Sequence, residues 1–307
     1  MKKVFALLLT MTMVLSLAAC GGKKEEAPAE TPETPAETPA EKPAGWWKEE
    51  LSTVTDGKLT VATSPDFAPY EFYAIGEDGK PQLAGFDLAL AQYIADYMGL
   101  ELDVIPMDFD GVIMEVGMNN VDLGMAGLSP DPKRANQMDF SDIYYEGGQS
   151  LVAVEANADK FTTLEAANDP DVSVGAQIGS IQADLAMQNS PDANIIQLSK
   201  VTDIIAELIS GKMDAAYIET VVAESYQKNY PELKIVCDVP YEVAGSAIGV
   251  MKDNEALMAG VNEAIAAALA DGSMSAFIAE ANELAAGETY EGLLDANGEA
   301  PAEAPAA

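Results

Sequence analysis

The stretch AGFDLALAQYIADYMGLELDVIPM, residues 84–107, decides which fold class the chain can adopt. Its first part places Phe86, Leu90 and Ile94 at helical spacing and ends at Gly99, which is typical of a helix C-terminus. The run ELDVIPM that follows is apolar and short, which favours a strand. A helix that leads directly into a strand is the repeating unit of α/β proteins.

The same alternation continues on both sides of this stretch. A strand, KLTVATS (58–64), precedes it, and a short helix, FDGVIMEVGMNN, and a strand, VDLGMAG, follow it over residues 109–127. The pattern restarts at QSLVAVEA (149–156) and alternates as far as one or two alanine-rich helices at 254–284. The sequence therefore predicts an α/β fold with two lobes, each built on a doubly wound mixed sheet.

Two apolar segments, QSLVAVE and IVCDVPYEVAGSAIGV, flank the second block of alternating elements. Two segments that cross between two lobes are the plan of a hinged clamp with a cleft. We expect lobe 1 to comprise residues 51–148 and 240–290, and lobe 2 to comprise residues 149–239.

The composition limits the possible classes of function. The chain carries 51 acidic and 16 basic residues, with a formal net charge of −35. This charge repels phosphate backbones and therefore excludes a nucleic-acid partner. The chain has no histidine, which excludes histidine acid–base catalysis, Ser-His-Asp triads and histidine metal sites. We expect neither a metal nor a cofactor.

The N-terminal residues carry the features of an exported protein. MKKVFALLLTMTMVLSLAAC has a basic start, an apolar run and small residues before Cys20, which predicts a signal peptide over residues 1–19. Its end, LAACG, resembles a bacterial lipobox, which implies that Cys20 is lipidated and becomes the mature N-terminus. The alternative is an ordinary signal peptide followed by an incidental cysteine.

Two segments of biased composition flank the expected folded body. Residues 20–50 include KKEEAPAETPETPAETPAEKPA, a Pro/Glu/Thr/Ala segment that we interpret as an extended tether. Residues 291–307 are expected to form a disordered tail. We expect the lipid at Cys20 to hold the body on the outer face of the bacterial cell membrane. The other cysteine, Cys237, is expected to pack as a small hydrophobe on a strand.

The single arginine of the chain, Arg134, lies in GLSPDPKR (127–134). The expected strand VDLGMAG ends just before Ser129, which we interpret as the N-cap of a helix whose first turn holds the two prolines. Ligands of open α/β sheets bind at the carboxyl ends of strands, and a guanidinium presents a planar pair of donors to a carboxylate. Arg134 and Ser129 are therefore candidates for holding a carboxylate. The alternative is a surface arginine paired with Asp131 or Asp139.

Three other strand ends carry candidate residues. GAQIGSIQADL opens a helix at Ser180 and Ile181, whose first amides face the expected cleft. Glu219 ends an apolar strand, where its carboxylate either receives an ammonium or favours the dipole of the next helix. Phe67 in TSPDFAPYEF and Phe109 after LDVIPMD are placed to clamp a ligand or to pack in the core.

The chain resembles the polar amino-acid family of extracytoplasmic solute-binding proteins over residues 57–285. The motifs that carry the resemblance occur in order: TSPDFAPYEF, GFDLALAQYIADYMG, GLSPDPKR with MDFSDIYY, GSIQADL and GKMDAAYIE. The resemblance implies a type II periplasmic-binding-protein fold, a clamp with two crossover hinge segments. It also implies a monomeric binding protein, not an enzyme, that captures a free L-amino acid and delivers it to an ABC permease in the membrane.

The family binds its ligand through residues at the strand ends that face the cleft. The resemblance implies these positions in the present chain: Ser64, Asp66, Phe67, Phe109, Gly127, Ser129, Arg134, Ser180, Ile181, Gln182 and Glu219. Arg134, Ser129 and the backbone amide of Ile181 are implied for the α-carboxylate, with Ser180 beside them. Glu219 is implied for the α-ammonium, at a position where many relatives have Asp.

The resemblance implies further that Phe67 and Phe109 stack on the ligand side chain. Relatives that select basic ligands often carry an acid where this chain has Ser64, and hydroxyls where it has Ala126 and Gly127. Asp66 or Asp108 are the acids placed to compensate. The sequence leaves open which polar amino acid is bound.

Two other functions are compatible with the sequence. A few proteins that resemble this family are dehydratases of prephenate-like or arogenate-like acids, for which Arg134 would hold a substrate carboxylate and Glu219 would act as acid or base. No second basic group is placed for a dicarboxylic substrate, which argues against this alternative. A surface lipoprotein or adhesin would instead present an apolar patch and bind no small ligand.

Overall fold

The computed structural model describes residues 42–242, 245–287 and 289–290. The expected signal peptide, Cys20, and the expected tail from residue 291 lie outside these residues, as does the expected tether as far as residue 41.

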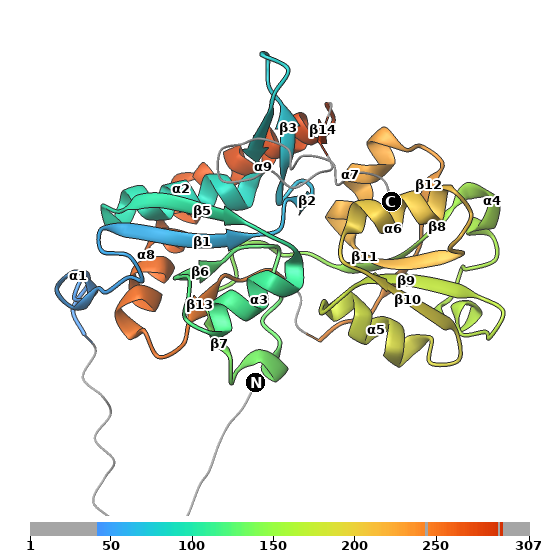
Figure 1. The fold of residues 1–307 in the computed structure, drawn as a ribbon, viewed down its shortest axis with the longest axis horizontal. Helices are drawn as coiled ribbons and strands as arrows, with labels where there is room; N and C mark the ends of the chain where they lie inside the picture. The colour runs from blue at the N-terminus through green and yellow to red at the C-terminus, as the bar shows by residue number, and fades with distance from the viewer. Residues whose placement is uncertain (1–41, 243–244, 288, 291–307) are drawn as a thin grey trace, which may run out of the picture. The chain divides into compact units, whose positions relative to one another are not determined.

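The first lobe is built on a five-stranded mixed sheet with the strand order β5-β1-β6-β13-β7 (Figure 1). β1 is parallel to β5 and β6, whereas β13 is antiparallel to β6 and β7. The strands are β1 (Lys58–Thr63), β5 (Glu101–Pro106), β6 (Leu123–Gly124), β7 (Met138–Phe140) and β13 (Gly249–Met251).

Helices cover both faces of the first sheet because side chains alternate along its central strand. Leu59 and Val61 of β1 belong to the buried cluster that includes α2 and α8, whereas Ala62 packs with α3. The helices of this lobe are α1 (Trp47–Glu50), α2 (Phe86–Met98), α3 (Phe109–Gly117), α8 (Glu255–Asp271) and α9 (Ser273–Ala285), with the 3-10 turn η1 (Pro132–Arg134). The expected end of α2 is confirmed: Gly99 caps it with φ 72°.

The second lobe repeats this plan with the strand order β10-β9-β11-β8-β12. Its strands are β8 (Gln149–Val154), β9 (Ser173–Gln177), β10 (Asn194–Leu198), β11 (Ala215–Glu219) and β12 (Leu233–Val239). Its helices are α4 (Glu155–Ala158), α5 (Ile181–Asn189), α6 (Val201–Ile209) and α7 (Thr220–Asn229), with the 3-10 turn η2 (Leu164–Ala167). Tyr217 of β11 packs in the cluster that includes α5, and Ile218 in the cluster that includes α6 and α7. The expected pair of mixed sheets is confirmed.

A small antiparallel sheet, which the sequence analysis did not predict, extends the first lobe above α2 in Figure 1. It contains β2 (Asp66–Phe67), β3 (Glu71–Ile75), β4 (Pro81–Ala84) and β14 (Thr289–Tyr290). The aromatic stretch TSPDFAPYEF therefore forms β2, a turn and the start of β3. Phe67 belongs to the buried cluster that also contains Val201 of the second lobe.

The second connection between the lobes lies inside the predicted segment IVCDVPYEVAGSAIGV (235–250), whereas the first precedes the predicted segment QSLVAVE. β8 and β12 pair with each other inside the second sheet, and the crossings are residues 141–148 and 240–248, of which 243–244 are not described. These segments meet at one antiparallel bridge between Tyr145 and Ser246, where the Ser246 amide donates to the Tyr145 carbonyl at 2.8 Å. Two further backbone hydrogen bonds join the crossings, from the Ser141 amide to the Ile248 carbonyl and from the Tyr144 amide to the Ser246 carbonyl, each at 3.0 Å. The crossings therefore run as one short paired connection between the lobes.

The folded body begins before residue 51, inside the segment expected to be tether. Trp47 of α1 is buried, and its Nε1 donates a hydrogen bond to Glu263 of α8 at 2.9 Å. The Gly45 amide donates to the other oxygen of the same carboxylate at 3.0 Å, and Trp47 stacks on Tyr97. An apolar ring with a satisfied N–H thus fastens this segment to the first lobe.

Among the described residues, no single helix is long and apolar enough to cross a bilayer, and α8 and α9 reach that length and composition only together, across a 79° bend.

The Trp47 contact predicts a loss of stability that is confined to the first lobe. Trp47→Ala should lower the free energy of unfolding by about 3–5 kcal/mol, because a fully buried ring is lost from a packed site. Urea unfolding monitored by circular dichroism measures this change. Trp46→Ala is the matched control, since Trp46 is only half-buried, and its loss should be smaller. Equal losses in the two variants would contradict the assignment.

Candidate functional site

The segment around Arg134 begins differently from the sequence prediction. Ser129 does not cap a helix: the N-cap is Asp131, whose side chain accepts a hydrogen bond from the Lys133 amide at 2.9 Å. The helix is a single 3-10 turn, and Pro132 occupies its first position, where a missing N–H leaves no helical hydrogen bond unmade. A turn this short has little dipole, so the charge at this site comes from the Arg134 side chain.

The Arg134 guanidinium is buried without an acidic partner. The side chain is 8% exposed, and its Nη2 donates to the Gly179 carbonyl of the other lobe at 2.9 Å. Its Cζ lies 5.8 Å from the centre of the Phe109 ring, within cation–π range. Among the described residues no carboxylate lies within ion-pair distance of Arg134. Burial accordingly lowers the pKa of Arg134.

The alternative of a surface arginine paired with a nearby acid is not realised. Asp131 caps the turn, and Asp139 pairs with Lys252. A guanidinium has five N–H donors, and a buried one needs acceptors for them. The Gly179 carbonyl supplies only one acceptor, so Arg134 retains capacity for an anion.

The second lobe presents the start of α5 at this point, as the sequence predicts. Ser180 is the N-cap of α5, and its Oγ accepts from the Ala183 amide at 3.2 Å and donates to the Gln177 carbonyl at 2.8 Å. Ser180 and Ile181 are both buried. The amide of Ile181 has no acceptor inside the helix, because the first turn lacks a preceding carbonyl.

Glu219 lies at the last position of β11, where it also caps α7. Its Oε2 accepts from the Val222 amide at 2.9 Å, whereas its Oε1 is buried and has no hydrogen-bond partner. The side chain is 3% exposed. Burial raises the pKa of Glu219 to about 7, and the nearby backbone amides and the Tyr70 hydroxyl offset only part of that effect. The helix-capping interpretation of Glu219 is thus confirmed for one oxygen, and the other oxygen makes no hydrogen bond among the described residues.

Two residues lie close to Glu219 Oε1, the oxygen without a hydrogen-bond partner. They are Gly147 of the first crossing segment and Tyr70, which directly precedes β3. A Cβ placed on Gly147 would lie 2.5 Å from Oε1 and 3.3 Å from the Tyr70 hydroxyl. The Tyr70 hydroxyl is itself hydrogen-bonded to the Ser246 hydroxyl at 3.0 Å. The absence of a side chain at 147 is thus what lets the hinge approach this carboxylate.

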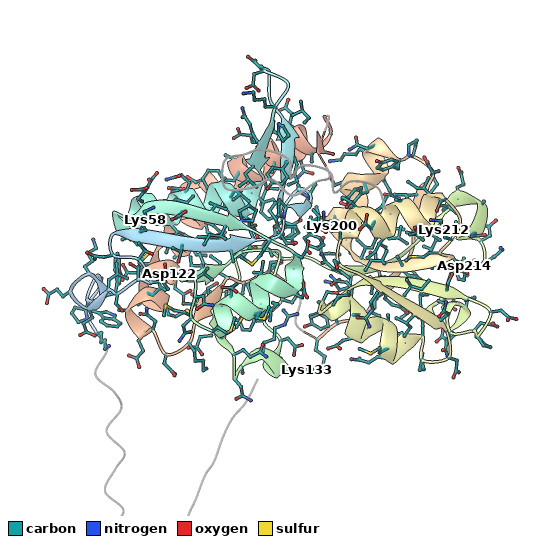
Figure 2. All side chains as sticks on the ribbon, in the orientation of Figure 1. Lys58, Asp122, Lys133, Lys200, Lys212 and Asp214 are labelled. Atoms are coloured by element: carbon teal, nitrogen blue, oxygen red, sulfur yellow. The ribbon has the colours of Figure 1, made fainter. Side chains whose placement is uncertain are left out.

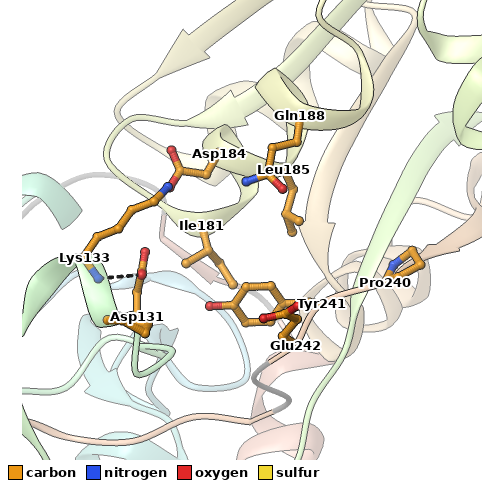
Figure 3. A pocket seen from close by; sticks show the side chains of 10 residues that line it. Asp131, Lys133, Ile181, Asp184, Leu185, Gln188, Pro240, Tyr241 and Glu242 are labelled. Atoms are coloured by element: carbon orange, nitrogen blue, oxygen red, sulfur yellow. Dashed lines mark hydrogen bonds and ion pairs between the residues drawn. The ribbon is translucent and has the colours of Figure 1, made fainter.

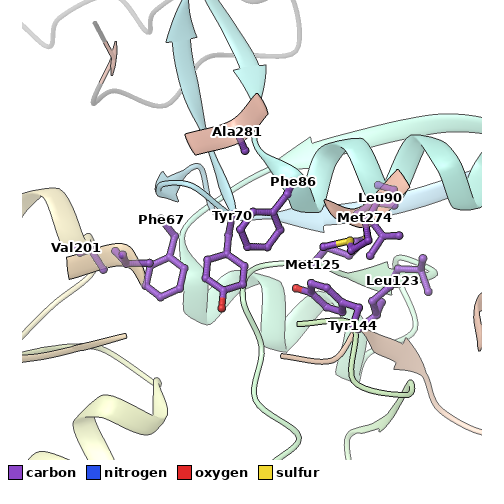
Figure 4. Close-up of a cluster of buried hydrophobic side chains, with 14 of the residues drawn as sticks. Phe67, Tyr70, Phe86, Leu90, Leu123, Met125, Tyr144, Val201, Met274 and Ala281 are labelled. Carbon is purple, nitrogen blue, oxygen red and sulfur yellow. The ribbon is translucent and has the colours of Figure 1, made fainter. Parts of the chain in front are cut away.

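The two predicted aromatic residues are buried, Phe67 in contact with Tyr70 and Phe109 beside the Arg134 guanidinium. Phe67 and Phe109 are each 7% exposed, and Figure 4 shows Phe67 between Tyr70 and Val201 of the second lobe. Gly127 adopts φ +56°, and a Cβ there would lie 2.7 Å from the Phe67 ring. Phe67 therefore packs directly on the Gly127 backbone.

Three predicted residues are already bonded within the protein. The Ser64 hydroxyl donates to Asp66 Oδ1 at 2.7 Å, and the other oxygen of Asp66 accepts from Gln177 and Val201 of the second lobe at 3.1 and 2.6 Å. Burial raises the pKa of Asp66 to about 6. Gln182 donates to Gln149 Oε1 at 2.8 Å.

Sequence reasoning did not select Tyr70, Gly147, Gln149 or Gln177. Gln177 is 4% exposed at the end of β9, and Tyr70 is fully buried. Gln177 carried a usable signal, because it is a polar residue at the carboxyl end of an apolar strand. Gly147 carried none, since its role depends on contact with a residue far along the chain.

A cavity lies next to the candidate site, but neither Arg134 nor Glu219 lines it. This cavity of about 400 Å³ lies between the lobes, and Asp131, Lys133, Asp184 and Tyr241 are among its lining residues (Figure 3). Lys133 forms an exposed ion pair with Asp184 across it. A neighbouring cavity of about 250 Å³ is lined by Arg134, Gly179 and Ser180. The two cavities share Asp131, Lys133 and Asp184, so they adjoin each other next to the Arg134 side chain.

Asp87 and Glu71 form a second group of buried acids, next to the Gly127 loop. Asp87 of α2 accepts from the Gly127 amide at 3.1 Å and from the Tyr144 hydroxyl at 2.7 Å. Glu71 lies beside Asp87, fully buried, and neither of its carboxyl oxygens has a hydrogen-bond partner. Burial and the neighbouring carboxylate raise the pKa of Glu71 well above its usual range, and burial raises that of Asp87 to about 6.

Cys237 lies half-buried on β12, packs against the second-lobe cluster and forms no disulfide among the described residues. In the same part of the chain, no three His, Cys, Asp or Glu side chains are arranged to hold a metal ion.

Comparison with known proteins identifies the family of the chain. The family model of bacterial extracellular solute-binding proteins, family 3, matches residues 59–280. The chain belongs to this family. The expected resemblance and the two-lobed type II fold are thereby confirmed.

Several family 3 proteins are similar to the chain along most of its described length. The arginine-binding extracellular protein ArtP of Bacillus subtilis is 36% identical over 203 residues, which cover 64% of this chain and 76% of that protein. The structure of an amino acid ABC transporter substrate-binding protein, AbpA, of Streptococcus pneumoniae bound to L-arginine is 31% identical, with a TM-score of 0.72. This structural match covers 76% of this chain and 97% of the AbpA chain.

One enzyme is also similar. The cyclohexadienyl dehydratase of Pseudomonas aeruginosa is 28% identical over 198 residues, which cover 64% of this chain and 72% of that protein. This match is weaker than that to ArtP, and the more similar proteins are binding proteins of transporters. The chain is a solute-binding protein, not an enzyme.

The buried acids predict that ligand-free protein is more stable in mild acid than in base. Glu71, Asp66, Asp87 and Glu219 all have raised pKa values in the folded state, so folding gains protons. The stability that they contribute is present below their unfolded pKa and is lost as the pH rises through about 6–7.

We expect the melting temperature to be higher at pH 5.5 than at pH 8, measured by differential scanning calorimetry. One unit of raised pKa corresponds to about 1.4 kcal/mol, or about 2–4 °C for a domain of 150–250 residues. Glu219→Gln should flatten the profile near pH 7. A melting temperature that rises from pH 5.5 to 8 would contradict these protonation states.

Proposed function

We propose that the chain is the lipid-anchored substrate-binding component of an ABC importer, which captures a free polar L-amino acid in the cleft between its lobes. The observation that carries the proposal is a pair of buried groups of opposite charge. The Arg134 cation has no acidic partner among the described residues, and Glu219 Oε1 has no donor. A zwitterion supplies what each group lacks, a carboxylate for the guanidinium and an ammonium for the carboxylate.

The other site residues take roles around this pair. Ser129, Ser180 and the Ile181 amide complete the carboxylate site beside Arg134. Phe67 and Phe109 stack on the ligand side chain from the first lobe, which the position of Phe109 beside the Arg134 guanidinium supports. We place Gly127, Gln182 and Ser64 around the pocket, where each contacts either the ligand or a residue that holds it.

L-Arginine is the first ligand to test. ArtP is named for arginine, and AbpA was solved with L-arginine bound. In this chain, Ser64 and Asp66 bind each other and the second lobe, so the acid available to a guanidinium or amide ligand from the first lobe is Asp108, which is half-buried at the start of α3. Other polar amino acids are therefore tested beside arginine.

Delivery of the ligand follows from closure of the clamp. Residues 51–148 and 240–290 form one lobe and 149–239 the other, and the crossings at 141–148 and 240–248 act as the hinge. Because the ligand binds both lobes, its binding free energy shifts the equilibrium to the closed state, which ABC permease subunits recognise. Cys20 carries the lipid, and residues 20–46 tether the monomeric body to the outer face of the membrane.

Isothermal titration calorimetry of the full chain with the twenty amino acids tests this function. At least one polar L-amino acid should bind with a dissociation constant well below ~1 mM, which corresponds to about −4 kcal/mol. No binding tighter than that limit would contradict the proposal.

Substitution at Arg134 tests how the carboxylate is held. Arg134→Lys keeps the charge but loses the planar pair of donors, so we expect a loss of about tenfold or more, and a larger loss in Arg134→Ala. Lys133→Ala is the matched control, because Lys133 is exposed and pairs only with Asp184 and its own turn. Unchanged affinity in Arg134→Ala would overturn the carboxylate assignment.

A further inference from the structure

Helix α6 in the second lobe lacks a capping side chain of its own. Its N-cap residue is Lys200, which provides no side-chain hydrogen bond to the first turn. In the second lobe, the two other helices of nine or more residues are capped by their own N-cap side chains, α5 by Ser180 and α7 by Glu219. In the first lobe, Asn254 caps α8, whereas α2, α3 and α9 have no side-chain cap. An uncapped helix start leaves backbone N–H groups without acceptors, and this one is buried.

A carboxylate of the first lobe supplies the missing cap. Asp66 Oδ2 accepts from the Val201 amide, the first residue of α6, at 2.6 Å. The same oxygen accepts from Gln177 Nε2 at 3.1 Å, and the Tyr226 hydroxyl donates to the Asp66 carbonyl at 3.2 Å. A negative charge at a helix N-terminus is also favoured by the helix dipole.

The contact lies deep in the boundary between the lobes. Lys200, the residue before α6, is located at this boundary in Figure 2, and Figure 4 shows Val201 beside Phe67, the neighbour of Asp66. Asp66 is 7% exposed and Val201 3%. The polar contacts between the lobes through Lys133 and Lys228 are exposed by comparison, and exposed pairs contribute little.

We propose that Asp66 is a positioning residue that closes the clamp: its carboxylate caps α6 across the cleft and stabilises the closed state without touching the ligand. Both of its oxygens are occupied by protein donors, the second one from Ser64. Opening the lobes breaks the bonds to Val201, Gln177 and Tyr226 together. This proposal depends on the proposed function in one respect, namely that the lobes close when the ligand binds.

The distance between the lobes tests this role directly. Spin labels at Met114→Cys on α3 and Met187→Cys on α5, both exposed positions on different lobes, report opening in the full chain when Cys20 and Cys237 are replaced. Without ligand, Asp66→Ala should lower the ratio of closed to open molecules about fivefold, the usual effect of losing a cap. The dissociation constant for L-arginine should rise by the same factor.

A double-mutant cycle shows whether the partner is the α6 amide. Val201→Pro removes that N–H at the first helical position, where proline is tolerated, and the extended Lys200 backbone (φ −120°, ψ 139°) accepts a following proline. Val201→Ala corrects for the lost packing. Asp66→Ala and Val201→Pro should each open the clamp, and the double variant should open it no further than one of them.

Asn254→Ala is the matched control, because Asn254 caps α8 inside the first lobe. It should lower stability and leave the distance between the labels unchanged. The proposal is overturned if Asp66→Ala leaves the distances unchanged, or if it weakens arginine binding at unchanged distances, which would make Asp66 a ligand contact. Because the ligand-free distances decide the outcome, a failure to bind any amino acid would count against the proposed function alone.

Discussion

Two buried charges that lack partners determine how the rest of the molecule is arranged. Arg134 comes from a short turn of the first lobe and Glu219 from a strand end of the second, and burial acts against the charged form of each. A buried charge left without a partner costs about 3–5 kcal/mol in proteins where one has been removed. In the proposed function, a ligand that carries the complementary charges offsets this cost for both groups.

The remaining features of the site serve to present these groups from two bodies that move. The parallel strands of each sheet end toward the other lobe, so that loops and helix starts, rather than helix sides, meet there. Glycines at 127 and 147 let the backbone approach Phe67 and Glu219, where a side chain would collide. Asp87 ties the Gly127 loop to the first crossing segment through Tyr144, so the ligand wall and the hinge are connected within one lobe.

The sequence predicted those parts of the fold that are encoded locally. Helical spacing and Gly99 placed α2, and Ser180 and Glu219 were located at the starts of α5 and α7. The single arginine was selected because of its chemistry, and its burial agrees with that interpretation. One local prediction was wrong: Asp131, not Ser129, caps the segment, because the Asp131 side chain accepts from the Lys133 amide, and the segment forms a single 3-10 turn.

What the sequence did not reveal depends on contacts between distant residues. Asp66 appeared to be a ligand contact, but its partners Gln177 and Val201 lie more than a hundred positions away. The first crossing was expected at the apolar run QSLVAVE, which instead forms β8 and pairs with β12 inside the second sheet. Trp47 appeared to belong to the tether, since its contact with Glu263 joins opposite ends of the chain.

Analogues of the ligand show whether one zwitterion neutralises both buried groups. Calorimetry would compare the amino acid that binds best with its α-carboxamide, which lacks the negative charge, and its des-amino acid, which lacks the positive one. Each analogue should bind at least about a hundredfold more weakly, because each leaves one buried group without a partner of opposite charge. Binding of either analogue as tight as that of the parent amino acid would mean that the two groups do not hold the charges of the ligand.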